Sequence, residues 1–210
     1  MIYVYGVTDG RPARLGDLHA VEHGALAGVY SAQPPHDLTP TEENLWQHEH
    51  VLERLMGERA VLPLRFGSTL RDAEALRDLL RERELEFATA IAAVRGRVEM
   101  GVRASVAAEE APRPDGSGRA YLEAKLARRR AAAQLGESLH TELSPLARAA
   151  TYTLALEPRP TFAGAYLVER DQAVSFRSRC DEAAAAHPEV ELACTGPWPP
   201  FSFAQAVEAQ

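Results

Sequence analysis

The order of extended and helical patterns in the second half of the chain most constrains the fold. The patterns are, in order, a strand Val98–Val106, a helix from Gly118 to about Leu143, strands Ala150–Leu156 and Phe162–Val168, a short helix capped by Asp171, and a strand Val190–Cys194. This βαββαβ order predicts a ferredoxin-like unit, a four-stranded antiparallel sheet with two helices on one face. In the first of these helices we expect Leu122, Leu126 and Leu139 to face inward.

The first 95 residues predict a different order, ββαβα. Its elements are a strand Ile2–Val7, an extended region Leu18–Ser31 with a turn at Glu22-His23-Gly24, a helix capped by Thr39 and ending near Gly57, a short strand Val61–Gly67, and a long helix opened by Thr69 and continuing to Val94. Pro63 places the short strand at a sheet edge, because proline cannot donate a ladder hydrogen bond.

Both halves mix helices and strands, so the fold class is α+β with two domains. We expect an N-terminal α+β domain over residues 1–95, a C-terminal ferredoxin-like domain over 96–194, and a tail over 195–210 that packs on a domain or on a partner. Residues 109–118 hold two prolines and two glycines and predict a loop. Residues 11–20 match no recognisable pattern of secondary structure.

Charge and cysteine content narrow the possible partners and compartment. The formal net charge of −7 argues against nucleic acid or an anionic membrane as the main partner, because both attract basic surfaces. With 2 cysteines, the chain is unlike a secreted disulfide scaffold. The sequence has no leader-like segment and no apolar run of about 18 residues. We therefore expect a cytoplasmic protein without a membrane partner.

The segment Thr195–Phe203 concentrates proline, glycine and aromatic residues near the end of the chain. Proline fixes φ and lacks an N–H, which disfavours both a helix and a long ladder strand here. Exposed aromatic surface in such a segment predicts docking, either onto the chain's own domain or onto a partner. Large aromatic side chains also dominate small cores, so Trp198 equally fits a core position.

No catalytic, cofactor-binding or metal-binding residues are predicted. His48 and His50 lie two positions apart on a predicted helix and point about 200° from each other, whereas helical metal pairs are spaced by three or four residues. Cys180 and Cys194 lack a CxxC spacing, so buried unreactive thiols are the better interpretation. Glu99 lies in a predicted strand, and we expect its carboxylate to face solvent or to pair with an arginine.

Arg65-Phe66-Gly67 follows an apolar, proline-containing run and precedes a helix start. An arginine at this place could bind an anion, or it could pair with a carboxylate of its own domain. The first possibility gives an alternative function, a ferredoxin-like small-molecule or anion-binding enzyme that uses Arg65 and a histidine. A regulatory binding module is a third possibility.

Several segments together resemble the gas vesicle protein F/L family, in the family's order and along nearly the whole chain. They are Tyr3-Val4-Tyr5-Gly6, His50 followed by Val61–Gly67, Val98–Val102, Ala120-Tyr121-Leu122, and Thr195–Phe203. The Leu-Pro-Leu-Arg-Phe-Gly segment and the Gly-Pro-Trp-Pro-Pro tail are the specific ones.

The resemblance implies a cytoplasmic, non-enzymatic accessory protein of gas vesicle formation. Its partners would be the small hydrophobic shell protein and other accessory proteins. A shell subunit that borders a gas space is strongly apolar and aggregates unless it is held. We expect the contact surface to include Trp198, Phe201 and Phe203 first, and Pro63, Arg65 and Phe66 second.

Overall fold

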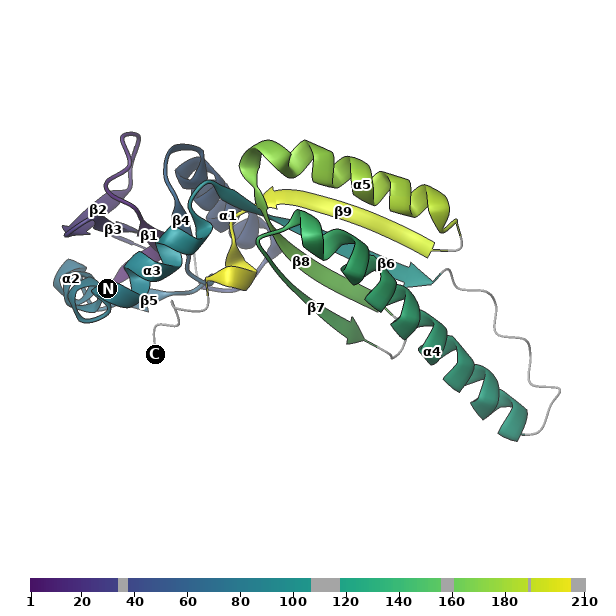
Figure 1. The fold of residues 1–210 in the computed structure, drawn as a ribbon. Coiled ribbons are helices and arrows are strands. Elements are labelled where there is room, and N and C mark those ends of the chain that lie inside the picture. The colour runs from purple at the N-terminus through teal and green to yellow at the C-terminus, as the bar shows by residue number, and fades with distance from the viewer. Residues whose placement is uncertain (34–37, 107–117, 156–160, 189, 205–210) are drawn as a thin grey trace. The chain divides into compact units, whose positions relative to one another are not determined.

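The computed structural model describes residues 1–33, 38–106, 118–155, 161–188 and 190–204. Contacts within the chain divide it into two compact units, Met1–Val98 with Trp198–Gln210, and Glu99–Pro197. Each unit has its own sheet (Figure 1). The expected domain limits at 95 and 194 stay predictions, because contacts alone do not show that either segment folds by itself.

The sheet of the first unit is built around strand β1 (Ile2–Thr8), every residue of which is buried. Its antiparallel neighbours are β3 (Leu26–Ser31) on one side and β4 (Val61–Pro63) and β5 (Thr69–Leu70) on the other, with β2 (His19–His23) beyond β3. The continuous apolar run of β1 is what a central strand covered on both faces requires. The expected hairpin in Leu18–Ser31 is therefore present, and Pro63 lies at an edge as predicted.

Helices cover both faces of this sheet. Helix α1 (Glu42–Glu58) contacts β1 and β4, while α2 (Ala73–Glu82) contacts β2 and β3 and α3 (Glu84–Val94) contacts β3 and β4. Gly6 of β1 faces Leu52 of α1, and Gly28 of β3 faces Leu76 of α2. Because Gly28 pairs with Val7, the residue next to Gly6, these two glycines point to opposite faces.

Two predicted helix starts were wrong. Thr41, not Thr39, caps α1, and its hydroxyl accepts the backbone N–H of Asn44. Asp72, not Thr69, caps α2, because Thr69 and Leu70 pair with β1 as strand β5. The expected single long helix is also interrupted at Arg83, whose backbone leaves the helical region at φ −114°, ψ 25°. The interruption lets α2 pack on β2 and β3 while α3 packs on β3 and β4.

The second unit has the predicted ferredoxin-like order. Its elements are β6 (Arg97–Val106, beginning in the first unit), α4 (Gly118–Leu143), β7 (Ala149–Ala155), β8 (Thr161–Glu169), α5 (Ala173–Ala186) and β9 (Val190–Trp198), with single 3-10 turns at Ser144–Leu146 and Arg170–Gln172. The strands lie in the order β7-β8-β6-β9, and both helices cover the same face (Figure 1). This arrangement confirms the α+β class and the ferredoxin-like topology.

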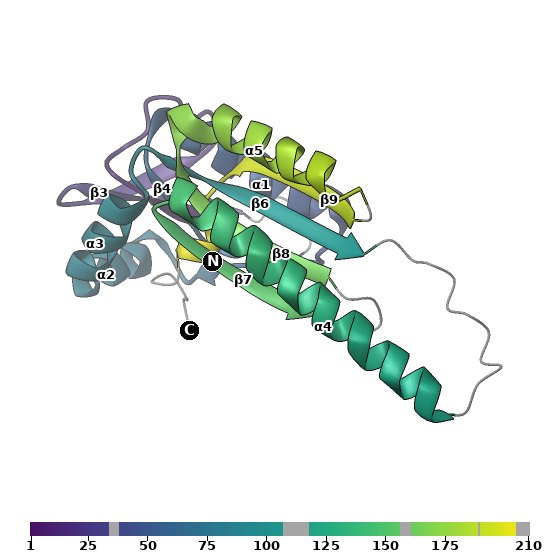
Figure 2. The ribbon, with the colours of Figure 1, turned by 45° about the vertical axis from the view of Figure 1, so that its right-hand side comes forward.

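Three local predictions in this half need correction. Leu122 and Leu126 are exposed, because the first turns of α4 run past the end of the sheet, whereas Leu139 is buried (Figure 2). Strand β9 continues beyond Cys194 to Trp198, and Phe201–Phe203 forms one 3-10 turn. An edge strand tolerates Pro197 because its N–H side can face away from the ladder. The turn expected at 157–160 and most of the expected loop at 109–118 lie outside the described residues.

Among the described residues, no helix is both long and apolar enough to cross a membrane.

Candidate binding surface

Four rings from three segments form an aromatic cluster in the first unit: Tyr3 and Tyr5 from β1, His48 from α1, and Phe66 from the loop after β4. The Tyr5 and His48 rings are stacked with centroids 5.5 Å apart. The Phe66 ring meets Tyr3 at 6.1 Å and His48 at 5.9 Å, both edge to face. Edge-to-face and offset arrangements are the favourable geometries for such rings. The cluster therefore ties the Arg65-Phe66-Gly67 loop to the core.

Hydrogen bonds fix the same loop. The Tyr3 hydroxyl lies 2.8 Å from Nδ1 of His48 and accepts the backbone N–H of Gly67 at 3.3 Å. Nε2 of His48 lies 3.0 Å from the carbonyl oxygen of Leu64. Because a carbonyl only accepts, Nε2 carries the proton, and Nδ1 accepts from the Tyr3 hydroxyl. Gly67 adopts a φ of 88°, the left-handed region that glycine enters without strain.

Burial keeps both titratable groups of this network neutral. It lowers the pKa of His48 below 6.5, partly opposed by the bond to Leu64. It raises the pKa of Tyr3 to about 12, partly opposed by the bond from Gly67. Desolvation disfavours the charged form of either group. With both ring nitrogens of His48 engaged, this histidine holds the loop and is not placed to serve as a metal ligand or proton carrier.

The predicted contact residues of this region differ in accessibility. Pro63 is buried in β4 opposite Gly6, Phe66 is half-buried, and the Arg65 side chain is exposed. The backbone carbonyl of Arg65 accepts both the amide and the hydroxyl of Ser68, at 3.2 and 2.7 Å. The loop therefore presents Phe66 and Arg65 from a backbone that is held at several points.

The predicted tail residues belong to the first unit by their contacts. Pro199 and Pro200 are buried, while Trp198, Phe201 and Phe203 are each half-buried. The amide of Phe203 donates to the carbonyl of Pro200 at 3.1 Å, closing the 3-10 turn. The three rings thus keep part of their surface open to a partner.

A hollow beside Trp46 on α1 is a feature that sequence reasoning missed. It has a volume of about 470 Å³ and is lined by Tyr5, Asp17, Leu18, Trp46, Gln47, His50, Val51 and Arg54. Trp46 is 55% exposed, since it lies off the buried face of α1. A tryptophan out of phase with the helix's apolar positions was the available signal. Part of the lining comes from residues 11–20, whose structure the sequence did not indicate.

Side chains at the C-terminal end of α1 hold residues 11–14 in place. The Glu58 carboxylate accepts the amides of Ala13 and Arg14 at 2.8 and 3.3 Å. Arg59 donates to the carbonyl oxygen of Arg11 at 3.2 Å. The part of the unmatched segment that precedes β2 is thus an irregular loop fixed to the end of a helix.

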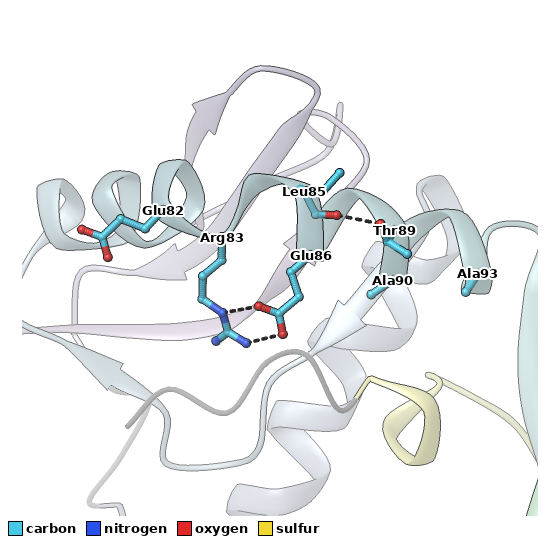
Figure 3. A pocket seen from close by; sticks show the side chains of 7 residues that line it. All are labelled: Glu82, Arg83, Leu85, Glu86, Thr89, Ala90 and Ala93. Atoms are coloured by element: carbon cyan, nitrogen blue, oxygen red, sulfur yellow. Dashed lines mark hydrogen bonds and ion pairs between the residues drawn. The ribbon is translucent and has the colours of Figure 1, made fainter.

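A second hollow, of about 540 Å³, lies along α3, from Glu82 just before the helix to Ala93 near its end (Figure 3). Arg83 and Glu86 face each other there and form two hydrogen bonds of 2.8 and 2.7 Å. Leu85 at its margin is 82% exposed. Besides this ion pair and Leu85, the lining consists of Glu82, Thr89, Ala90 and Ala93.

Within the described ranges, no three His, Cys, Asp or Glu side chains are grouped to hold a metal ion. His48 and His50 do not form a pair, since His48 is buried in the aromatic cluster while His50 lines the hollow beside Trp46. Cys180 and Cys194, by contrast, are brought together by α5 and β9, where each thiol influences the pKa of the other. Sequence spacing gave no sign of that pairing.

The fold and this surface define a two-unit α+β protein with a ferredoxin-like second unit and an aromatic surface on its first. The chain belongs to a family of gas vesicle accessory proteins: the family model described as gas vesicle synthesis protein GvpL/GvpF matches residues 1–205. The resemblance seen in the sequence is thereby confirmed.

Relatives and solved structures agree with this assignment. Gas vesicle protein L of Streptomyces sp. (strain CB03234) is 33% identical over 250 residues, covering 98% of this chain and 93% of that protein. Gas vesicle protein F of the same strain is 30% identical over 238 residues, covering 97% and 99%. The crystal structure of GvpF from Anabaena sp. PCC7120 has a TM-score of 0.79 at 19% identity and covers 100% of this chain and 98% of that chain. This last similarity bears on the fold alone.

Proposed function

We propose that this protein binds the hydrophobic shell protein of the gas vesicle in the cytoplasm and holds it until assembly, without catalysing a reaction. The process, gas vesicle formation, follows from its membership in the GvpL/GvpF family. The observation that carries the binding role is the set of half-exposed rings in the first unit, above all Trp198, Phe201 and Phe203. Exposed aromatic surface typically marks an interaction site.

The chemistry of the proposed partner fits such a surface. A strongly apolar subunit aggregates in water, so a holding protein must offer apolar area that the subunit can cover. Half-buried aromatic rings provide this area at a low cost in side-chain entropy, because their inner edges are already fixed by packing. Two buried prolines, Pro199 and Pro200, lie between Trp198 and the other two tail rings, and their fixed φ angles further limit the motion of the segment.

The loop that carries Arg65 and Phe66 is the second part of the proposed surface. Phe66 is held against Tyr3 and His48 and keeps an open side. Arg65 next to it is exposed and would form the polar rim of a contact. Pro63 is buried, so its part in this proposal is to shape the loop.

Point substitutions test this surface better than truncation. Removing everything after Cys194 would also remove the last four residues of β9, Thr195 to Trp198, and disturb the sheet. We would co-express the shell protein with the chain and measure capture by the wild type and by Trp198→Ala, Phe201→Ala/Phe203→Ala and Phe66→Ala. Leu85→Ala, at an exposed leucine of α3, is the matched control. Thermal unfolding of each variant shows whether the fold is retained.

The proposal expects capture by the wild type and by Leu85→Ala, and loss of capture by a folded Trp198→Ala or Phe66→Ala variant. Trp46→Ala is a further arm, because Trp46 lines a separate hollow of the same unit. Loss confined to that variant would move the contact from the tail and loop to α1. Failure of the wild type to capture the shell protein would overturn the binding role.

A further inference from the structure

The four edges of the two sheets are not equally protected. In the first unit, β2 carries Glu22 and two histidines, and β4 is three residues long and ends in Pro63. In the second unit, β9 carries Glu191 and Pro197. Charges, prolines and short length are the usual devices that prevent an edge strand from pairing with another chain. Strand β7 has none of them.

Strand β7 is a seven-residue run, Ala-Ala-Thr-Tyr-Thr-Leu-Ala, without a charged residue or proline. It lies at the end of the strand order and pairs with β8 alone among the described strands. Five of its residues are exposed and the other two are half-buried. Every second residue of an edge strand directs its backbone N–H and C=O away from the sheet, where they can bond another strand.

The sequence of β7 is nearly the same read from either end. With Tyr152 at the centre, Thr151 corresponds to Thr153 and Ala149 to Ala155, and the remaining pair is Ala150 and Leu154. Two such strands placed antiparallel about a two-fold axis at Tyr152 would set threonine opposite threonine and alanine opposite alanine. Threonine pairs across strands are favourable, and no like charges would meet.

We propose that β7 pairs antiparallel with β7 of a second copy of this chain, centred on Tyr152. The two four-stranded sheets then form one continuous sheet of eight strands. Self-complementarity is the reason for choosing a second copy as the partner. A strand from another protein would gain nothing from the symmetry of β7.

The surroundings of β7 suit this pairing. Tyr152 is 36% exposed, and its ring lies against His140 and Phe162 with centroids 4.5 and 5.5 Å away. The second copy's Tyr152 would cover the open edge of this ring. Arg148, just before the strand, is already paired with Glu169 at 3.0 Å, so this residue does not enter the interface as an unpaired cation.

The positions of the two threonines allow a charge test of both the surface and the register. Thr151 and Thr153 are exposed, and their neighbours on β8 are Ala165 and Ala163, so charged side chains fit there within one chain. In the proposed register, residue 151 of one copy faces residue 153 of the other. Thr151→Lys/Thr153→Lys therefore sets lysine opposite lysine twice, and Thr151→Glu/Thr153→Lys sets glutamate opposite lysine twice.

The experiment is sedimentation velocity of the full chain over a concentration series into the sub-millimolar range. We expect the weight-average mass of the wild type to rise from one chain toward two. The Lys/Lys variant should stay at one chain, and the Glu/Lys variant should associate at least as well as the wild type. Ala193→Lys/Thr195→Lys places the same two charges at exposed positions of β9 and should behave like the wild type.

Several outcomes would overturn the proposal. A wild type that stays at the mass of one chain throughout the series would do so without any variant, even if the Lys/Lys chain failed to fold. Wild-type association by a folded Lys/Lys variant would show that β7 is not the interface. Equal loss in the Lys/Lys and Glu/Lys variants would exclude the antiparallel register centred on Tyr152.

Discussion

The Tyr3 hydroxyl and Nδ1 of His48 lie 2.8 Å apart although 45 positions separate the two residues in the chain. This contact joins the central strand β1 to α1, and through Gly67 and Leu64 it joins both to the loop that presents Phe66. A buried donor or acceptor that loses its partner costs more than the net value of its hydrogen bond. The pair should therefore control the stability of the first unit.

Replacing Tyr3 with phenylalanine should lower the free energy of unfolding of the first unit by about 1–3 kcal/mol. The substitution keeps the ring but leaves Nδ1 of His48 and the amide of Gly67 without this partner. Trp46 and Trp198 both belong to the first unit, so tryptophan fluorescence in a urea titration measures its unfolding. Tyr30→Phe, at a half-buried tyrosine of β3, is the control and should change stability by less than about 0.5 kcal/mol. Equal effects of the two substitutions would contradict the proposed role of the Tyr3 hydroxyl.

The stability of the first unit should fall in acid because of His48. Burial lowers the pKa of His48 below its ordinary value of 6.5, so the unfolded chain takes up this proton before the folded chain does. The contribution of neutral His48 is therefore complete above about pH 6.5 and is lost as the pH falls toward the folded-state pKa. One proton limits the slope to about 1.4 kcal/mol per pH unit. Urea titrations at several pH values between 7.5 and 5 give the free energy of unfolding at each pH. Its dependence on pH should be weaker for His48→Gln than for the wild type. An unchanged slope would mean that another group causes the acid sensitivity.

The order of elements in the second unit was predicted correctly because each of its strands and helices has a recognisable local sequence pattern. The alternation in Val98–Val106 and the long helical pattern before Leu143 need no tertiary information to recognise. The first unit was harder. Thr69 has the pattern of a helix cap, yet pairing with β1 makes it part of a strand, and nothing in the local sequence at Arg83 marks the interruption between α2 and α3.

The candidate surface was predicted in part. The Phe66 loop and the tail rings stood out by composition, since proline and aromatic residues concentrate there. The Tyr3–His48 contact and the hollow beside Trp46 depend on residues far apart in the chain. Spacing along one helix could compare His48 with His50, but it could not show that Tyr3 packs against the first of them. Long-range contacts of this kind follow from the sheet register, which a single sequence leaves undetermined.

Two glycines provide a matched test of packing on the first unit. A Cβ on Gly28 would lie 2.9 Å from three carbon atoms of Leu76, so Gly28→Ala should destabilise the unit by about 1–3 kcal/mol through overpacking between β3 and α2. Gly57, exposed in α1, has nothing within 4 Å of such an atom, and Gly57→Ala should stabilise by about 0.5 kcal/mol through better helix propensity. Urea titrations followed by tryptophan fluorescence measure both. A stable Gly28→Ala variant would show that α2 can move away from the sheet at little cost.

Cys194 should react with alkylating reagents before Cys180. The Cys180 thiol donates a hydrogen bond that favours the Cys194 thiolate and lowers the pKa of Cys194, while the same bond and burial raise the pKa of Cys180. Cys180 is fully buried and Cys194 is half-buried, so access favours the same order. Mass spectrometry after timed iodoacetamide treatment of the native protein near pH 7.5 measures each rate. Cys180→Ala should slow alkylation of Cys194, because it removes the donor, whereas Cys180→Ser keeps a hydroxyl donor and should slow it less. Equal rates in these two variants would show that the bond does not control the reactivity of Cys194.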